Sequence, residues 1–244
     1  MSRSIAVISG KGGAGKSFFC INIAAALVKL GLSVLVIDTD SGMRNIDILL
    51  QKSDSLVFDL SDVALGNCSL EKAITPISKD GSFSVIAGAK NPDFIPSPEL
   101  LKAISNKLSD RFKFIIYDAP AGAGAIVKST VKAADRVILI TNPPKDSALT
   151  AAAVSQTVFN LCPSKPIHFV LNKVNPKGIT ASEMSPDEIM DTCVARFLGV
   201  IYSSKEEEGY RRNGKLLSLG DTREAQQLCN IARRICGQSI PLLL

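Results

Sequence analysis

No two cysteines in this 244-residue chain form a C-x-C or C-x-x-C pair, so the sequence shows no zinc or iron–sulfur spacing. The six are Cys20, Cys68, Cys162, Cys193, Cys229 and Cys236. In a chain of this length without a signal peptide, we expect reduced thiols that serve mainly in packing. Histidine occurs once, as His168, in an apolar segment without an acidic or cysteine neighbour, and we expect it to be structural.

Runs of like charge and long apolar runs are also missing. The net charge of +5 is dispersed, which permits contact with DNA, lipid or an acidic surface but does not demand it. No apolar run approaches the roughly 18 residues of a transmembrane helix. The N-terminus leads directly into an apolar segment, which leaves no room for a targeting sequence, so we expect a cytoplasmic protein.

The chain contains 46% hydrophobic and 21% charged residues, a composition typical of a globular protein with a sizeable core. Its periodicity predicts strands over residues 5–8, 34–37, 83–86, 112–117, 137–140, 167–171 and 197–201. It predicts helices over residues 16–30, 57–65, 98–108, 147–159 and 223–237, and a solvated face or helix start at 206–208. We find no repeat or domain boundary, and we expect one α/β domain over residues 1–244, a mainly parallel twisted sheet with helices on both faces.

Residues 10–17 fit the pattern G-x-x-x-x-G-K-[ST], with Gly10, Gly15, Lys16 and Ser17 in the fixed places. The motif lies between an apolar strand and a helix, which predicts the three-layer fold of P-loop NTPases. Backbone N–H groups of such a loop surround phosphate oxygens, while the lysine reaches the β- and γ-phosphates and the serine hydroxyl ligates Mg²⁺. The alternative is a glycine-rich turn without a ligand. The predicted nucleotide-binding residues of the loop are Gly10, Lys11, Gly12, Gly13, Ala14, Gly15, Lys16, Ser17 and Phe18.

Polar residues follow three of the predicted strands at the edge where open α/β sheets bind ligands. Asp38 and Asp40 follow the second strand, and Asp118 follows the strand that ends at residue 117. Carboxylates beside a polyphosphate favour an intervening Mg²⁺, so we expect a metal-shell or water-positioning role, with turn formation as the alternative. Asn172 follows a later strand, where its amide could pair with adenine or simply form a turn.

The K-G-G-x-G-K-S loop with its second lysine, the D-T-D strand end and the D-A-P-A-G strand end together resemble the deviant P-loop ATPases, the MinD and ParA family. Residues 43–47, 59–74, 171–174, 197–200 and 230–234 resemble corresponding stretches of its MinD members. The resemblance covers nearly the whole chain.

That resemblance implies a face-to-face homodimer that encloses ATP and Mg²⁺, with Lys11 crossing to the partner's nucleotide. It implies that Asp40 positions the attacking water and that Asp38 and Asp118 lie in the Mg²⁺ shell through water. Asn45 would lie near the partner's face, and Asn172 would read adenine. ATP hydrolysis to ADP is expected to be slow and stimulated by a partner protein.

Three features depart from the family pattern. Residues 123–125 lack the usual glutamate, and Thr150, Ala151 and Ala152 stand where family members carry acidic residues that tether the loop lysine. The sequence therefore leaves the resting position of Lys11 open. MinD proteins end in a basic amphipathic membrane-binding helix, whereas this chain stops at Leu244, so attachment at the inner face of the cell membrane stays open.

The leading functional hypothesis is an ATP-dependent dimerising switch that positions other proteins, such as a division-site regulator. A metal-cluster or metal-insertion carrier ATPase is the second, and the missing cysteine pairs argue against it. A ParA-type DNA-partition ATPase is the third. The small positive charge allows that function, but we see no basic helix and expect no sequence-specific binding to nucleic acid.

Overall fold

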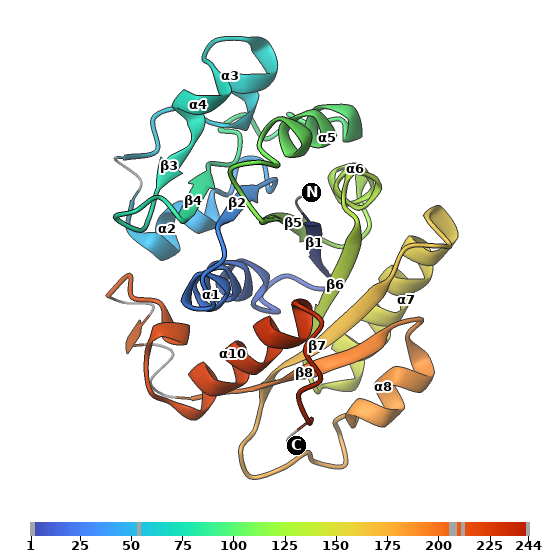
Figure 1. Ribbon diagram of the computed structural model, residues 1–244. Helices are drawn as coiled ribbons and strands as arrows, with labels where there is room; N and C mark the ends of the chain where they lie inside the picture. The colour runs from blue at the N-terminus through green and yellow to red at the C-terminus, as the bar shows by residue number, and fades with distance from the viewer. Residues whose placement is uncertain (1–2, 53–54, 205–208, 211–212, 243–244) are drawn as a thin grey trace.

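The computed structural model describes residues 3–52, 55–204, 209–210 and 213–242 (Figure 1). All seven predicted strands form, and the sheet gains one short strand, β3. The strands are β1 Arg3–Ser9, β2 Val34–Asp38, β3 Thr75–Pro76, β4 Phe83–Ile86, β5 Phe114–Ala121, β6 Arg136–Thr141, β7 Ile167–Val174 and β8 Arg196–Tyr202.

The five predicted helices form as well, and further short ones appear between them. The helices are α1 Lys16–Lys29, α2 Asn45–Leu50, α3 Leu60–Leu65, α4 Leu70–Ala73, α5 Pro98–Lys107, α6 Ala125–Ala133, α7 Lys145–Leu161, α8 Pro186–Thr192, α10 Arg223–Ile235 and the 3₁₀ turn η2 Leu217–Leu219. The acidic run at 206–208 lies outside the described residues. None of the helices that the structure describes is long and apolar enough to cross a bilayer.

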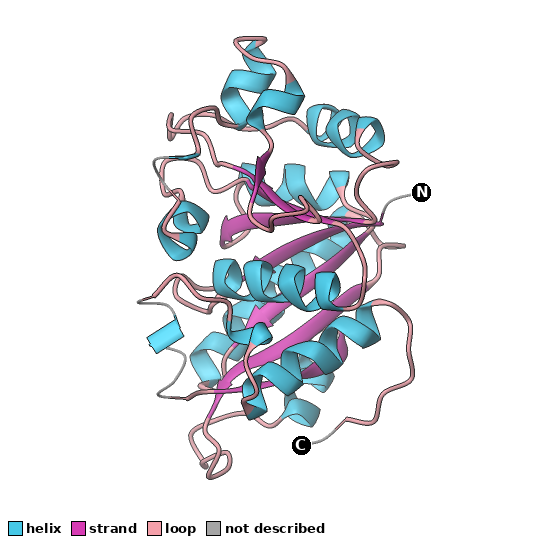
Figure 2. Cartoon of the chain, turned by 60° about the vertical axis from the view of Figure 1, so that its left-hand side comes forward, coloured by secondary structure: helices cyan, strands magenta, loops and turns pink. Residues whose placement is uncertain are grey.

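The strands form one sheet in the order β3-β4-β2-β5-β1-β6-β7-β8 (Figure 2). Every pair is parallel except β3 with β4. Parallel neighbours require crossover connections, and helices supply them on both faces. The prediction of a mainly parallel α/β fold is confirmed.

The sheet has a hydrophobic core on each face, and successive residues along a strand are buried alternately in one core and in the other. On β1, Ile5 and Val7 join the core beneath α1, α2 and α10, while Ala6 and Ile8 join the core beneath α3 to α8. This is the period-2 alternation of a strand covered on both sides. It explains why the strands appear in the sequence as continuous apolar runs.

Several element ends differ from the predicted ones for identifiable reasons. Helix α3 begins at Leu60 rather than 57, because Asp59 caps it with an extended backbone and forms a capping box with Asp62. Strand β5 continues through Ala121 because β1 pairs with it as far as Ser9. Helix α7 begins two residues early, directly after Pro144.

The sheet order places the polar strand ends side by side. Asp38 of β2 stands opposite Asp118 of β5, and β5 is in turn the neighbour of β1, which leads into the phosphate loop. Three segments that are far apart in the sequence therefore meet at one carboxyl edge. His168 lies half-buried on β7 opposite Arg196, away from that edge.

Candidate functional site

The phosphate loop has a left-handed backbone at two points, a conformation that favours glycine. Gly13 and Gly15 have φ values of 75° and 98°, in the left-handed region, and Gly15 is the N-cap of α1. A Cβ atom on Gly15 would lie 2.3 Å from Nδ2 of Asn172. One on Gly10 would lie 2.6 Å from the backbone carbon of Thr150, so α7 packs directly against the loop.

Long polar side chains from elsewhere in the chain hold the carbonyl oxygens of this loop. Nδ2 of Asn172 donates to the carbonyl of Ala14 over 2.9 Å, and Nζ of Lys173 donates to that of Gly13 over 2.8 Å. Asn142 in turn donates to the carbonyl of Asn172 over 3.0 Å. Anchored carbonyls turn the N–H side of a loop toward an anion. Asn172 and Lys173 thus support the loop, a role that the sequence did not predict.

A cavity of about 290 Å³ opens beside the loop. Its lining comes from the loop and the first turn of α1, from the helix α2 and from one residue of β7: Gly13, Gly15, Lys16, Ser17 and Phe18, then Asn45, Ile48 and Leu49, then Lys173. Most of the predicted nucleotide-binding residues therefore share one space with Asn45 at the start of α2. The positive end of α1 and the ammonium group of Lys16 face this region, which suits an anionic ligand.

Asp38 and Asp118 are both fully buried at the sheet edge, and each has one oxygen held and one unpartnered. Oδ1 of Asp38 accepts the backbone N–H of Asp40 over 2.8 Å, and Oδ1 of Asp118 accepts the Cys20 thiol over 3.6 Å. Oδ2 of each has no hydrogen-bond partner. Buried carboxylate oxygens are normally paired, so this pair indicates a site for a positive group.

The protonation balance of the pair supports the same conclusion. Burial raises the pKa of Asp118 to about 6, although a hydrogen bond from the Ser17 side chain and the positive charge of Lys16 act to lower it. Burial, and then the charge of Asp118, raises the pKa of Asp38. A bound divalent cation would stabilise both charged forms. Oxygen ligands of this kind suit Mg²⁺, which proteins usually bind through one or two carboxylates together with substrate phosphates.

Asp40 lies at the mouth of the site, half-exposed, where Nδ2 of Asn45 donates to its Oδ2 over 3.3 Å. Burial raises the pKa of Asp40, and Lys16 and Asn45 act in the opposite direction. The structure thus brings Asp40, Asn45 and Lys16 together.

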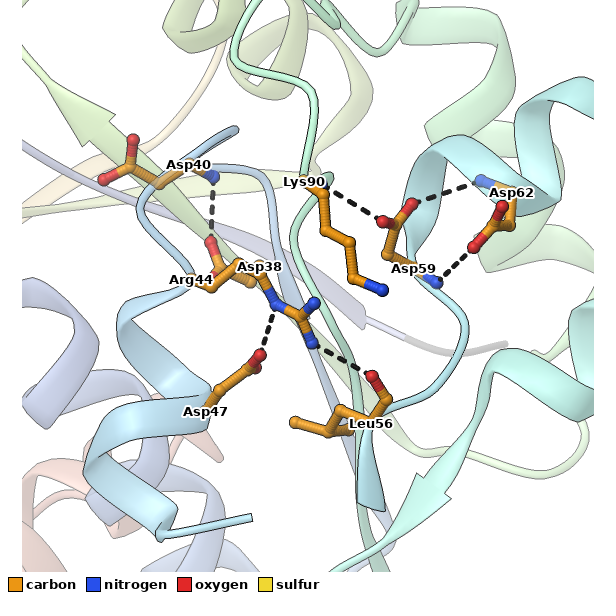
Figure 3. Close-up of polar contacts among 8 residues, drawn as sticks. All are labelled: Asp38, Asp40, Arg44, Asp47, Leu56, Asp59, Asp62 and Lys90. Carbon is orange, nitrogen blue, oxygen red and sulfur yellow. Dashed lines mark hydrogen bonds and ion pairs between the residues drawn. The ribbon is translucent and has the colours of Figure 1, made fainter. Parts of the chain in front are cut away.

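An arginine–aspartate pair behind Asp40 was not predicted as part of the site (Figure 3). Arg44 has a left-handed backbone with φ of 46°, and its Nε pairs with Oδ2 of the buried Asp47. Its Nη2 donates to the carbonyl of Leu56 over 3.0 Å. Arg44 therefore ties the loop that carries Asp40 to the segment before α3.

Lys11 is held by a carboxylate, although Thr150, Ala151 and Ala152 supply none. Its Nζ pairs with Oδ2 of Asp146 in the first turn of α7. The sequence analysis looked one turn too late because the predicted helix began at residue 147. Hydrogen bonding from Lys11 lowers the pKa of Asp146, which keeps this carboxylate charged.

A family model described as the CobQ/CobB/MinD/ParA nucleotide binding domain matches residues 5–214. Among curated proteins, the septum site-determining protein MinD of Synechocystis sp. is 31% identical over 251 residues, covering 100% of this chain and 92% of that protein.

Solved structures agree. The chain superimposes on a chain of the MinC:MinD cell division protein complex of Aquifex aeolicus with a TM-score of 0.89 and 28% identity, covering 100% of this chain and 99% of that one. MinD of Pyrococcus horikoshii, solved with Mg-ADP, gives a TM-score of 0.82 with 25% identity and covers 96% of both chains.

Proposed function

The chain belongs to the CobQ/CobB/MinD/ParA nucleotide-binding family, and from this premise we propose that it is an ATP-dependent dimerising switch in cell-division site selection. Its class, a MinD-like ATPase, rests on the full-length match. The homodimer, the Mg²⁺ dependence, the stimulation by a partner protein and the role of each site residue are the proposal. The proposal treats residues 1–244 as one ATPase domain, which the continuous eight-stranded sheet supports.

The observation that carries the proposal is the pair of unpartnered carboxylate oxygens beside the phosphate loop. Asp38 and Asp118, acting through water, and the Ser17 hydroxyl would hold Mg²⁺ once phosphates are present. When bound, Mg²⁺ neutralises charge on the phosphates. Among the described residues, no group of three or more His, Cys, Asp or Glu side chains could hold a metal alone. The nucleotide is therefore needed to complete the site.

The remaining residues position the reactants. Lys16 contacts the phosphates from the first turn of α1, and Asp40 orients the attacking water. Asn45 donates to Asp40 and so fixes the orientation of that carboxylate. The side chain of Asn172 reads adenine, in addition to its support of the loop.

Lys11 acts in a second subunit in this proposal. Its ion pair with Asp146 leaves 42% and 68% of the two side-chain surfaces exposed. Exposed pairs of this kind stabilise a fold by at most about 1 kcal/mol, so the pair can open at little cost. Release from Asp146 lets the amine reach the nucleotide of a facing subunit, where it stabilises the charge that develops in hydrolysis.

The test is the molar mass of Asp40→Ala measured by light scattering after size exclusion, first with ADP and then with ATP. This variant should bind ATP without hydrolysing it. We expect the 25.9 kDa chain to run as a monomer with ADP and as a dimer with ATP. A monomer with both nucleotides at high protein concentration would refute the dimer.

Lys11→Ala in the same background separates nucleotide binding from dimerisation. It should keep nucleotide affinity and lose the ATP-dependent dimer. Lys132→Ala, which removes an exposed lysine from the far end of α6, is the matched control and should dimerise normally. Normal dimerisation of the Lys11 variant would remove the cross-subunit role.

A protein partner is part of the proposal because a MinD structure matched by this chain was solved in a complex with MinC. We propose that such a partner recognises the ATP-bound dimer and stimulates hydrolysis. Recognition of one nucleotide state follows when the binding surface exists only in the dimer. Attachment to the inner face of the cell membrane is a further proposal, which flotation with lipid vesicles would test.

A further inference from the structure

One thiol lies directly beneath the nucleotide-binding edge. Cys20 is on α1, three and four residues after Ser17 and Lys16, so all three share the end of the helix that faces the loop. Its side chain is fully buried, and Sγ lies 3.6 Å from Oδ1 of Asp118, a residue 98 positions away in the sequence. The sequence analysis had assigned this cysteine to packing.

The two buried carboxylates differ in the group that holds them. Oδ1 of Asp38 is held by a backbone N–H, that of Asp40, whose position the chain itself fixes. Oδ1 of Asp118 is held by a side chain, the Cys20 thiol, and the Ser17 hydroxyl is a second side-chain donor to the same carboxylate. In both residues Oδ2 is left without a partner. A thiol is a weak donor, so it can fix the rotation of a carboxylate while withdrawing little of its charge.

We propose that Cys20 is a positioning residue that orients Asp118 toward Mg²⁺ and thereby sets the magnesium dependence of nucleotide binding. The inference rests on the proposed function of this site. Groups that hydrogen-bond to a metal-binding carboxylate fix its direction, and their loss weakens metal affinity even though they never touch the metal. Cys20 also packs against the apolar core beneath α1 and α10, so the experiment must separate orientation from packing.

The experiment measures binding of a fluorescent ADP analogue while Mg²⁺ is titrated, and repeats the measurement in EDTA. Cys20→Ala and Cys20→Val both remove the donor, one leaving a small space and the other filling it. We expect each variant to raise the Mg²⁺ concentration for half-maximal nucleotide binding by about three- to tenfold. This is at or below the low end of the loss of metal affinity that usually follows removal of such a supporting group, because a thiol is a weak donor. Affinity in EDTA should stay within about twofold, since the phosphate loop is intact.

Two further variants assign the cause. Cys20→Ser keeps a donor on the same Cβ atom and should return the Mg²⁺ requirement toward that of the native protein. Cys193→Ala removes a thiol buried in the other core, where burial raises the pKa to about 11, and should leave the requirement unchanged. If either donor-free variant fails to fold, the other decides.

Each result is decisive. An unchanged Mg²⁺ requirement in the donor-free variants would overturn the inference, as would equal shifts in the Cys20 and Cys193 variants. If Cys20→Ser does not restore the Mg²⁺ requirement and the variants also lose nucleotide affinity in EDTA, Cys20 serves only in packing. That result would also overturn the inference. Failure of the native protein to bind the nucleotide at any Mg²⁺ concentration would instead refute the proposed function.

Discussion

The buried carboxylates of Asp38 and Asp59 are drawn together in Figure 3, and Asp118 stands opposite Asp38 in the sheet. The hydrogen bonding of Asp59 is the opposite of that of the other two. Asp59, before α3, accepts the N–H groups of Ser61 over 2.8 Å and of Lys90 over 3.1 Å. Burial alone would raise the pKa of Asp59, but the hydrogen bond from the Ser61 hydroxyl and those from backbone N–H groups outweigh burial and lower it. Asp118 is more deeply buried, keeps an unpartnered oxygen and has a pKa raised to about 6.

The difference separates a carboxylate that stabilises the fold from two that, in the proposed function, serve a ligand. A buried carboxylate with all its hydrogen bonds satisfied stabilises its surroundings, as Asp59 does for α3 and the segment at Lys90. A buried carboxylate with a free oxygen costs stability until a cation arrives. Asp38 and Asp118 are of the second kind, which is why they mark the site.

The largest expected effect comes from Asp118→Asn. Removing the charge should weaken Mg²⁺-dependent nucleotide binding by at least about tenfold, because the cation loses a carboxylate. In EDTA the same variant should melt at a higher temperature than the native protein, since a buried and uncompensated charge is gone. Fluorescent ADP binding and thermal melting measure the two effects. A lower melting temperature in EDTA would contradict the contrast with Asp59.

Asp59→Ala should lower the stability of the fold and leave nucleotide binding nearly unchanged, the reverse of Asp118→Asn. It removes the cap of α3 and the acceptor for the Lys90 N–H, which we expect to cost about 1–2 kcal/mol of unfolding free energy. Nucleotide affinity with Mg²⁺ should stay within about twofold, because Asp59 does not line the cavity beside the phosphate loop. Urea unfolding and nucleotide titration check both. Asp93→Ala, at an exposed aspartate in a different turn, is the matched control.

The two carboxylates should also give stability opposite pH dependences in EDTA. A raised folded-state pKa means that Asp118 contributes stability below its unfolded pKa of about 3.9 and loses it as pH rises toward about 6. A lowered pKa means that Asp59 contributes above about 3.9 and loses that contribution as pH falls.

Urea unfolding of the native protein, Asp118→Asn and Asp59→Ala from pH 4 to 7 would show this. As pH rises through this window, the unfolding free energy of Asp118→Asn should increase relative to that of the native protein by on the order of 2 kcal/mol. The deficit of the Asp59 variant should stay nearly constant above pH 5. Parallel curves for all three proteins would show that the pKa of Asp118 is not raised.

The smallest effect is expected for Asp146→Asn, which releases Lys11. The pair is exposed, so the melting temperature should not change measurably. ATP-dependent dimerisation should instead occur at lower protein concentration, because Lys11 no longer has to leave a partner. Sedimentation over a concentration series measures this. Weaker dimerisation would show that Asp146 supports the dimer rather than holding Lys11 at rest.

The phosphate loop and the acids at the strand ends were predicted from the sequence because their geometry is local. The fixed spacing of Gly10, Gly15, Lys16 and Ser17 between a strand and a helix determines one backbone shape. Asp38 and Asp118 follow strands that must be parallel, so their meeting at one edge followed from the strand–helix order.

The tertiary structure alone decided which side chains support these groups. Cys20 meets Asp118 across 98 residues, Lys11 meets Asp146 across 135, and Asn172 meets Ala14 across 158. Such pairs depend on the order of strands in the sheet and on where each helix begins, and hydrophobic periodicity specifies neither. The sequence thus determined which groups meet at the carboxyl edge of the sheet, and the packing of distant segments decided how those groups are held.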